Sequence, residues 1–439
     1  MLDKVRRPAE RRGEEEDAVL SLTNARVFDG SDMLPSRYTL TLDDNRIASL
    51  SDRPNAAAPG EQIDLGGMTV MPGMVTCHLH PDTYKWTLQD HLSANRLGKE
   101  RPPGVMMAIG IRACKMMLES GFTGYVGAAC SNDIDAQLKM AIEENIIPGP
   151  RIRACGHHVG THADNNDSPK WWLRYDTWGT DIFADGPSGL RALVRDEIRR
   201  GAEVIKIFVS SGHAIPGHHG KRNMSHEEIA TIVETAHERG AKVRAHVCHK
   251  NLILEAIELG VDIIDHGDET DEECVEAMAR AGSFWVPSLM FLQLALDQGW
   301  ADEEGATAYG HACLHRSLPL AQKAGVRILL GDDYIGEPLP HEIGQYNQEL
   351  TLYASVAGIT PKDVLGWATK NAGELLVDAP AKSGVIEPGA LADLIVVDGD
   401  PLADLACLTR PQETLKAVIR DGVPVIDRLP ASARQRVAA

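Results

Sequence analysis

Several histidine, lysine and aspartate residues stand where apolar runs of the chain end. They are His78 and His80 in MPGMVTCHLH, Lys206 in VIKIFVSSG, His246 in KVRAHV, His266 in VDIIDHG, and Asp332 and Asp333 in VRILLGDD. Because His78 and His80 are two residues apart, both imidazoles would lie on the same side of an extended strand. Imidazoles combined with a carboxylate suit a divalent metal, first of all zinc, with manganese, cobalt or iron as alternatives. The sequence therefore predicts a site for one or two such ions.

Lys206 raises a separate question, because it lies at the centre of a short apolar segment. Its neighbours are Val204, Ile205, Ile207 and Phe208, and runs of this kind are typical of strands in a parallel sheet that is covered on both faces. A bare ammonium group in such a strand is unfavourable, since lysine is almost never fully buried without a partner. We therefore expect Lys206 to have a partner.

Eight short apolar runs in the middle of the chain alternate, for the most part, with helical patterns. The predicted strands are 71–80, 121–129, 148–156, 204–211, 242–247, 261–267, 283–289 and 326–333. This alternation predicts an α/β fold, a (β/α)8 TIM barrel, in which the carboxyl ends of the strands converge on one mouth. A doubly wound open sheet is the alternative, although no G-x-G-x-x-G pattern follows an early strand. In the barrel, the polar residues at the strand ends would share one volume.

Two helical patterns in this region begin with capping signals. Ser225 with Glu228 opens SHEEIATIVETAHERG, and Thr270 with Glu273 opens TDEECVEAMARAG. We expect the two helices to begin directly after Ser225 and Thr270.

β-rich segments flank the predicted barrel on both sides. Short strands with turn residues recur in 18–71 and again in 384–430. We expect these segments to form one small β-sandwich domain built from both chain ends, with the barrel at 72–383. Residues 1–17 are rich in charge and are expected to be a flexible tail.

The composition argues against several kinds of partner and location. The formal net charge of −19 argues against nucleic acid and anionic membrane, since both favour a basic surface. The chain has no membrane-spanning apolar run and no apolar signal sequence, and its eight cysteines are scattered singly. We therefore expect a cytoplasmic protein with reduced cysteines and a small-molecule substrate, and we leave open whether it forms a homo-oligomer.

The residues at the strand ends resemble the pattern of a known family. MPGMVTCHLH, the fourth-strand Lys206, the fifth-strand His246, DHG on the sixth strand and LLGDD on the eighth are similar to the amidohydrolase superfamily. The later segment GVIEPGALADLIVVDGDPL is similar to the C-terminal β-sandwich segment of that superfamily. The chain resembles the imidazolonepropionase-like and Xaa-Pro dipeptidase-like branch, which also includes hydrolases of ureas and carbamates. The resemblance covers nearly the whole chain after the tail.

The resemblance implies a set of metal ligands. By position, His78 and His80 would bind the more buried metal, and His246 and His266 would bind the second. The family's lysine at the position of Lys206 is commonly carboxylated by CO2, which gives a carbamate that bridges two metals. The alternative is an unmodified Lys206 paired with a carboxylate beside a single metal.

The resemblance also implies that the aspartate after the eighth strand binds metal and acts as the general base. An ungapped match of GVRILLGDDYIGE to the family's Gly-Thr-Asp pattern puts Asp333 at this position and Asp332 at the threonine. Asp333 is therefore the predicted base, and Asp332 is the alternative.

Residues that bind the substrate are expected in the loops after the strands. GHHVGTHADNND resembles a Gly-Gly-His-Gly-Asp loop of dipeptidase-like members and would put His162 beside the reacting carbonyl, with a solvated loop as the alternative. His213 and His249 are further candidates for binding the substrate, and Trp172 belongs to a group of three tryptophans that could form an apolar lid. Residues 246–249 read HVCH, where dipeptidase-like members often have His-Ala-Tyr, which puts peptidase activity in doubt.

Together these features predict a metal-dependent amidohydrolase. It would hydrolyse a C–N bond of the amide, urea or carbamate type in a small organic molecule or an N-acyl amino acid. A metal-bound hydroxide would attack the carbonyl carbon, and Asp333 would return the proton to the departing nitrogen. The alternatives are an Xaa-Pro-type dipeptidase, a cyclic-amide hydrolase or deaminase on the same scaffold, and a barrel that has lost catalysis.

Overall fold

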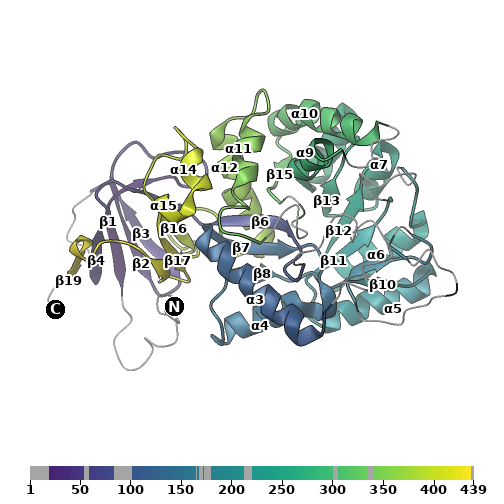
Figure 1. The fold of residues 1–439 in the computed structure, drawn as a ribbon, viewed down its shortest axis with the longest axis horizontal. Helices are drawn as coiled ribbons and strands as arrows, with labels where there is room; N and C mark the ends of the chain where they lie inside the picture. The colour runs from purple at the N-terminus through teal and green to yellow at the C-terminus, as the bar shows by residue number, and fades with distance from the viewer. Residues whose placement is uncertain are drawn as a thin grey trace.

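The structure is a computed structural model, and Figure 1 shows it as a ribbon. It describes residues 19–53, 59–83, 101–164, 166–167, 172, 179–211, 220–299, 305–331, 333 and 341–436. The predicted tail at 1–17 lies outside these residues. In Figure 1 a β-rich part lies on the left, and a larger part with alternating strands and helices lies on the right.

The larger part contains two parallel sheets. The first has the order β6–β7–β8, and the second has the order β10–β9–β11–β12–β13–β14–β15. Their bounds are β6 (Met74–Leu79), β7 (Phe122–Gly127), β8 (Arg151–Arg153), β9 (His158–Gly160), β10 (Asp181–Phe183), β11 (Val204–Phe208), β12 (Lys242–Val247), β13 (Ile263–His266), β14 (Phe284–Val286) and β15 (Arg327–Ile328). Each of the eight predicted strands is present, β12 with the predicted bounds and the other seven in shortened form, while β9 and β10 were not predicted.

Backbone hydrogen bonds connect the two parallel sheets at two places. Val204 N donates to Ala154 O at 3.1 Å, which links β11 to the residue after β8. Cys77 N donates to Leu330 O at 2.7 Å, which links β6 to the segment after β15. The carboxyl ends of β6 and of the strands from β11 to β15 therefore belong to one continuous framework.

Helices pack around these sheets. They are α3 (Pro103–Glu119), α4 (Ile134–Glu143), α5 (Gly186–Arg199), α6 (His226–His237), α7 (Lys250–Glu258), α8 (Glu272–Ala281), α9 (Leu289–Asp297), α10 (Ala306–Ala324), α11 (Gln348–Ala354), α12 (Pro361–Gly366) and α13 (Ala372–Leu376). The capping box of Ser225 and Glu228 before α6 is confirmed. The predicted cap of α8 is wrong by one residue, because Asp271 and not Thr270 accepts the hydrogen bond from the Cys274 backbone.

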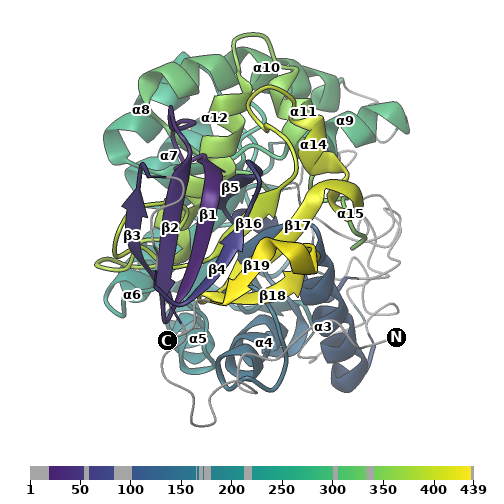
Figure 2. The same ribbon diagram turned by 90° about the vertical axis from the view of Figure 1, so that its left-hand side faces the viewer.

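The β-rich part is one sheet made from both ends of the chain. Its order is β18–β17–β16–β5–β1–β2–β3, and β4 pairs with β1 and β19. The bounds are β1 (Leu20–Val27), β2 (Tyr38–Asp43), β3 (Arg46–Ser51), β4 (Glu61–Asp64), β5 (Thr69–Pro72), β16 (Leu394–Val397), β17 (Leu415–Arg420), β18 (Val423–Asp427) and β19 (Arg434–Arg436). Figure 2 shows the early and late strands side by side, and Val70 of β5 pairs with Val396 of β16.

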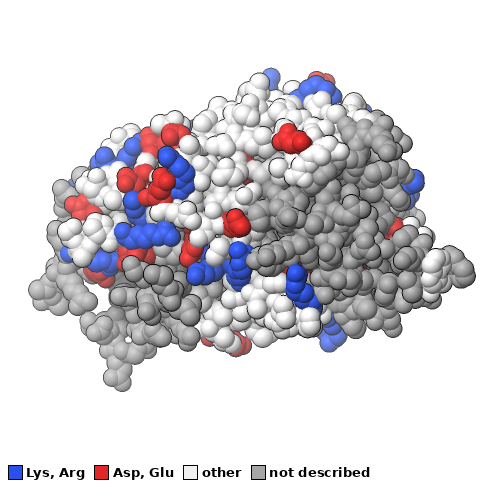
Figure 3. All heavy atoms as spheres, viewed as in Figure 1, with Lys and Arg blue, Asp and Glu red and all other residues white. Residues whose placement is uncertain are grey.

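The β-rich part has an apolar core of its own, which includes Leu22, Leu40, Ile47, Val70 and Ile419. On the face in Figure 3, acidic and basic side chains are interspersed over this part of the molecule. Among the helices that the structure describes, none combines the length and the apolar character needed to cross a membrane.

Candidate metal centre

The first group of predicted ligands meets at the carboxyl end of β6. The Oδ1 atom of Asp333 lies 3.0 Å from Nε2 of His80 and 3.5 Å from Nε2 of His78. One ligand atom from each of the three residues lies within 4.8 Å of the others. These three side chains can therefore contact the same small volume.

The other two predicted histidines lie next to this group. The ring centroids of His246 and His266 are 4.5 Å apart, and those of His266 and His78 are 5.1 Å apart. His78 and His80 are separated by 5.5 Å between their centroids. The structure thus brings together the four histidines from β6, β12 and β13.

Unusual backbone conformations bring two of these ligands into place. His266 has a φ of 65° and Asp333 a φ of 51°, in the left-handed region that residues other than glycine rarely adopt. Gly331 lets its segment approach β6 closely, because a Cβ at this position would lie 2.3 Å from the backbone nitrogen of His78. The amide of Gly331 donates to Oε2 of Glu349 at 3.0 Å, which fixes the segment that leads to Asp333.

Lys206 does have the partner that its burial demands. Its Nζ donates to Oδ2 of Asp265 at 2.6 Å, and Arg244 donates to both oxygens of the same carboxylate at 2.9 and 2.6 Å. Oδ1 of Asp265 lies 3.5 Å from Nδ1 of His78. The network therefore connects Lys206 to His78, the first of the predicted ligands. Sequence reasoning missed Asp265 and Arg244, although both are polar residues inside predicted core strands.

Burial and the neighbouring charges together set the pKa values of the groups in this network. Burial alone would raise the pKa of Asp265, but Arg244 and Lys206 hold it below its usual value. Burial lowers the pKa of Lys206, with Asp265 acting against this and Arg244 adding to it. Burial also lowers the pKa of His78, followed by the charges of Lys206 and Arg244. His78 is therefore neutral, the form that binds metal.

We expect Asp265→Asn to destabilise the metal-free protein by about 3–5 kcal/mol, because it leaves two buried cations without a carboxylate. Arg244→Met should cost less, since Lys206 and Asp265 still form a neutral pair. Urea unfolding of both variants after chelation measures the two free energies. A larger loss for Arg244→Met than for Asp265→Asn would contradict this account of the charges.

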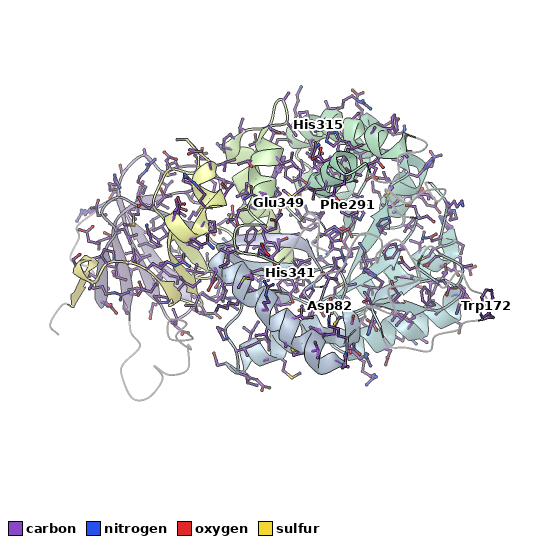
Figure 4. All side chains as sticks on the ribbon, in the orientation of Figure 1. Asp82, Trp172, Phe291, His315, His341 and Glu349 are labelled. Carbon is purple, nitrogen blue, oxygen red and sulfur yellow. The ribbon has the colours of Figure 1, made fainter. Side chains whose placement is uncertain are left out.

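His80 is fixed on two sides. Its Nδ1 lies 2.9 Å from the carbonyl oxygen of Ala129 and must carry the proton, because a carbonyl only accepts. Nε2 of His341 donates to the carbonyl oxygen of His80 at 3.0 Å, and Nδ1 of His341 accepts from the Tyr346 hydroxyl at 2.7 Å. Burial lowers the pKa of His341 to about 4, so it is neutral. Figure 4 shows His341 in the middle of the molecule.

This arrangement fits a cation. With Nδ1 bonded to the Ala129 carbonyl, the other ring nitrogen of His80, Nε2, lies only 3.0 Å from a carboxylate oxygen of Asp333. Two electron-rich atoms at this distance repel each other unless a proton or a metal ion lies between them. The hydrogen bond from Nδ1 to the backbone is also the contact that commonly orients a metal-binding histidine.

The structure describes two of the three predicted substrate-binding residues. His162 lies at the surface with its side chain 43 % exposed, and its Nδ1 is 2.7 Å from Oδ2 of Asp185. His249 precedes α7, and its Nε2 lies 3.6 Å from Oε2 of Glu269. These contacts join His162 to Asp185 and His249 to Glu269, and neither contact involves the four histidines of the candidate site. His213 lies outside the described residues. Trp172 is 65 % exposed and points outward at the edge of the molecule (Figure 4).

His158, which the sequence reasoning passed over, lies where a substrate-binding histidine was sought. It opens β9, and its ring centroid is 5.3 Å from that of His80 and 4.9 Å from that of Phe208. Its Nδ1 lies 2.9 Å from Oδ1 of Asp181. Phe208 in turn stacks on His246 with centroids 4.8 Å apart. His158 and Phe208 therefore border the predicted ligands His80 and His246.

A second group of possible ligands is a charge network. Nδ1 of His157 lies 3.0 Å from Oε1 of Glu197 and 3.4 Å from Oδ1 of Asp133, while Arg200 pairs with Asp133. Burial acts to lower the pKa of His157, but Glu197 and Asp133 raise it above its usual value. The two carboxylates of this group already have His157 and Arg200 as partners, which distinguishes it from the group at Asp333.

Residues 69–425 match the family model described as the amidohydrolase family. The chain belongs to this family. Members of the family generally bind divalent metals, which agrees with the histidines and aspartate at the strand ends. The chain is thus a hydrolase that acts on C–N bonds, as the sequence predicts.

Three similar proteins illustrate the range of the family. The ochratoxinase of Aspergillus niger is 28% identical over 395 residues, which cover 83% of this chain and 78% of that protein. Its solved structure has a TM-score of 0.82 at 26% identity and covers 94% of this chain and 96% of the other. The structure of a prolidase in complex with N-methylphosphonate-L-proline has a TM-score of 0.80 at 28% identity. The match covers 93% of this chain and 100% of the prolidase chain. Imidazolonepropionase of Caldanaerobacter subterraneus subsp. tengcongensis is 24% identical over 402 residues, which cover 83% of this chain and 84% of that protein.

Proposed function

We propose that this amidohydrolase cleaves the C–N bond of an amide, urea or carbamate in a small organic molecule or an N-acyl amino acid. The observation that carries the proposal is the carboxylate of Asp333 at 3.0 and 3.5 Å from the imidazoles of His80 and His78. A base beside potential metal ligands is what hydrolysis by an activated water requires.

The proposed metal ligands come in two sets. His78 and His80 would hold one divalent ion and His246 and His266 a second, with zinc as the first choice. Lys206, as a carbamate, would bridge them. A bound divalent cation acts as a Lewis acid on a carbonyl oxygen and makes water more acidic. The short contact between Asp333 and His80, and the neutral state of His78, support this assignment.

The side chains around the ions would then carry out the proton transfers. Asp333 would accept a proton from the attacking water and return it to the departing nitrogen, so no nucleophilic side chain is needed. We propose that His158 contacts the substrate's carbonyl group in place of His162, because its ring borders His80. Phe208, between His158 and His246, would form an apolar wall beside the scissile bond.

A linear Xaa-Pro dipeptide is the second candidate substrate. The similarity to the solved prolidase, at 28% identity over its full length, favours it. The residues HVCH at 246–249 argue against it, because they lack the tyrosine that dipeptidase-like members often carry. Cyclic amides remain a third option through the likeness to imidazolonepropionase.

We also propose that the two parallel sheets form one closed (β/α)8 barrel at 72–383, with the β-rich sheet at 18–71 and 384–430 as a β-sandwich domain. The backbone hydrogen bonds from Val204 to Ala154 and from Cys77 to Leu330 support closure, because they link the two sheets at two separate places. A reducing compartment such as the cytoplasm fits the eight cysteines, all of which are free and buried.

A panel of substrates with the metal-loaded protein tests the function. N-acyl amino acids, Xaa-Pro and other dipeptides, phenylureas, carbamates and cyclic amides are incubated with wild type and with Asp333→Asn, and the products are identified by mass spectrometry. We expect wild type to release an amine and a carboxylic or carbamic acid from a linear substrate. Ring opening or ammonia release alone would favour the cyclic-amide or deaminase alternative. If wild type turns over no more of any substrate than the variant does, the proposal fails.

A further inference from the structure

Strand β14 carries no predicted metal ligand, yet its middle residue contacts the strands on both sides. Trp285 is fully buried and pairs with Ile264 of β13 and with Ile328 of β15. Its backbone carbonyl accepts a hydrogen bond from Leu329 N at 2.9 Å. Trp285 thus lies between the strand that ends in His266 and the segment that leads to Asp333.

The indole of Trp285 contacts the backbone of a candidate metal ligand. Its Nε1 donates to the carbonyl oxygen of His266 at 2.9 Å. The next residue, Gly267, also has a left-handed backbone with a φ of 67°, and a Cβ there would lie 2.9 Å from Nε1 of Trp285. The indole therefore lies tightly against the peptide that joins His266 to Gly267.

The left-handed turn at His266 changes which way its side chain points. In a regular strand, consecutive side chains point to opposite faces. Here Asp265 contacts Lys206 and approaches His78, and the His266 ring also lies 5.1 Å from that of His78. Both consecutive residues face the same volume because the backbone leaves the extended conformation at His266, where φ is 65°.

We propose that Trp285 is a positioning residue of the metal centre. Its indole N–H holds the His266 carbonyl, keeps this residue in its left-handed conformation and so directs the imidazole toward His78 and His246. The inference rests on the proposed metal centre, and it adds to that centre a residue from a strand without ligands. Trp285 does not contact the reacting atoms, so its effect should appear first in metal binding.

Cobalt binding to metal-free protein tests the inference. Trp285→Phe removes the N–H and keeps most of the packing. Trp367→Phe is a matched control, because Trp367 is equally buried and its Nε1 donates to Gln322 at 2.8 Å, away from the metal ligands. Wild type and both variants are titrated with Co²⁺, and the dissociation constants and visible absorption spectra are recorded, with thermal unfolding of the metal-free proteins alongside.

We expect Trp285→Phe to weaken cobalt binding by about 10–100-fold and to change the absorption spectrum, as the loss of a contact that orients a ligand does. Trp367→Phe should bind cobalt with the same affinity as wild type. This should hold even if Trp367→Phe lowers the thermal stability as much as Trp285→Phe does. If Trp285→Phe does not fold, Gly267→Ala should show the same loss, because its methyl group would lie 2.8 Å from Oγ1 of Thr270 and 2.9 Å from Nε1 of Trp285, so that the indole has to move.

Equal cobalt affinity and equal spectra for wild type and Trp285→Phe would overturn the inference about Trp285 but leave the proposed metal centre standing. The same holds if both tryptophan variants lose affinity to the same extent, since the effect would then come from general packing. A wild-type protein that binds no cobalt would overturn the metal centre itself, and the inference with it.

Discussion

Asp333→Asn is expected to lower kcat by about 10²–10⁴ or more while the protein remains folded. The amide can neither accept the proton of the attacking water nor return it to the departing nitrogen. It is also a weaker partner for the His80 and His78 imidazoles, which lie 3.0 and 3.5 Å from the carboxylate. Turnover of the substrate found in the panel, measured at saturating metal, checks the effect, and circular dichroism checks the fold.

The neighbouring Asp332→Asn is the matched control. Alternation along a strand does not decide between the two aspartates, because β15 ends at Ile328 and Asp333 has a φ of 51°. Asp332 lies outside the described residues, so its milder effect remains a prediction from the sequence match. If Asp332→Asn is the inactive variant and Asp333→Asn keeps its turnover, the assignment of the base is wrong by one residue.

Lys206→Met is expected to abolish the second metal equivalent and to reduce turnover to near background. Methionine has a similar length but cannot form a carbamate, so it cannot bridge two ions, and Asp265 is left with Arg244 alone. Metal analysis of protein loaded in the presence of bicarbonate measures the stoichiometry. Wild type prepared with ¹³C-labelled bicarbonate should show a carbamate carbon by NMR that Lys206→Met lacks.

Lys250→Met serves as the control for this substitution. Lys250 pairs with Asp271 and Glu273 at the start of α8, apart from the metal ligands, so its variant should keep both metals and the NMR signal. Wild type with a single tightly bound metal and no carbamate signal would contradict the bridging carbamate. It would favour the alternative in which Lys206 keeps its ion pair with Asp265.

Much of the framework follows from local sequence patterns. Apolar runs and turn residues predicted eight of the ten strands in the two parallel sheets, because a strand covered on both faces must be apolar along its length. The capping box at Ser225 was correct, whereas the cap of α8 was placed on Thr270 although Asp271 lies next to it. Two adjacent residues that can both cap a helix are not separated by composition alone.

The candidate site was predicted only in part, for a physical reason. The histidines at 78, 80, 246 and 266 could be found because each ends an apolar run. Asp265 and Arg244 could not be paired from the sequence, since their contact joins two neighbouring strands. The sequence did contain a general indication of this pair, because charged residues inside a core strand are almost never fully buried without a partner of opposite charge.

His158 and His162 illustrate a second limit. They lie four residues apart in one polar loop, and the choice between them depends on the short strand β9, which was not predicted. Pairing of Lys206 with His158 across β11 and β9 sets His158 beside the proposed ligand His80, while His162 turns outward to Asp185. The left-handed turn at His266 likewise has no signal in a sequence that reads as an ordinary strand end.

Metal removal and return tests the central claim most directly, namely that the buried histidines and Asp333 hold ions that catalysis needs. The protein is treated with a chelator, its metal content is measured, and zinc, manganese or cobalt is returned in steps while hydrolysis is followed. The account predicts that the chelated protein is inactive and that activity rises with the metal bound, up to one or two ions per chain. Full turnover in protein without detectable metal would contradict it.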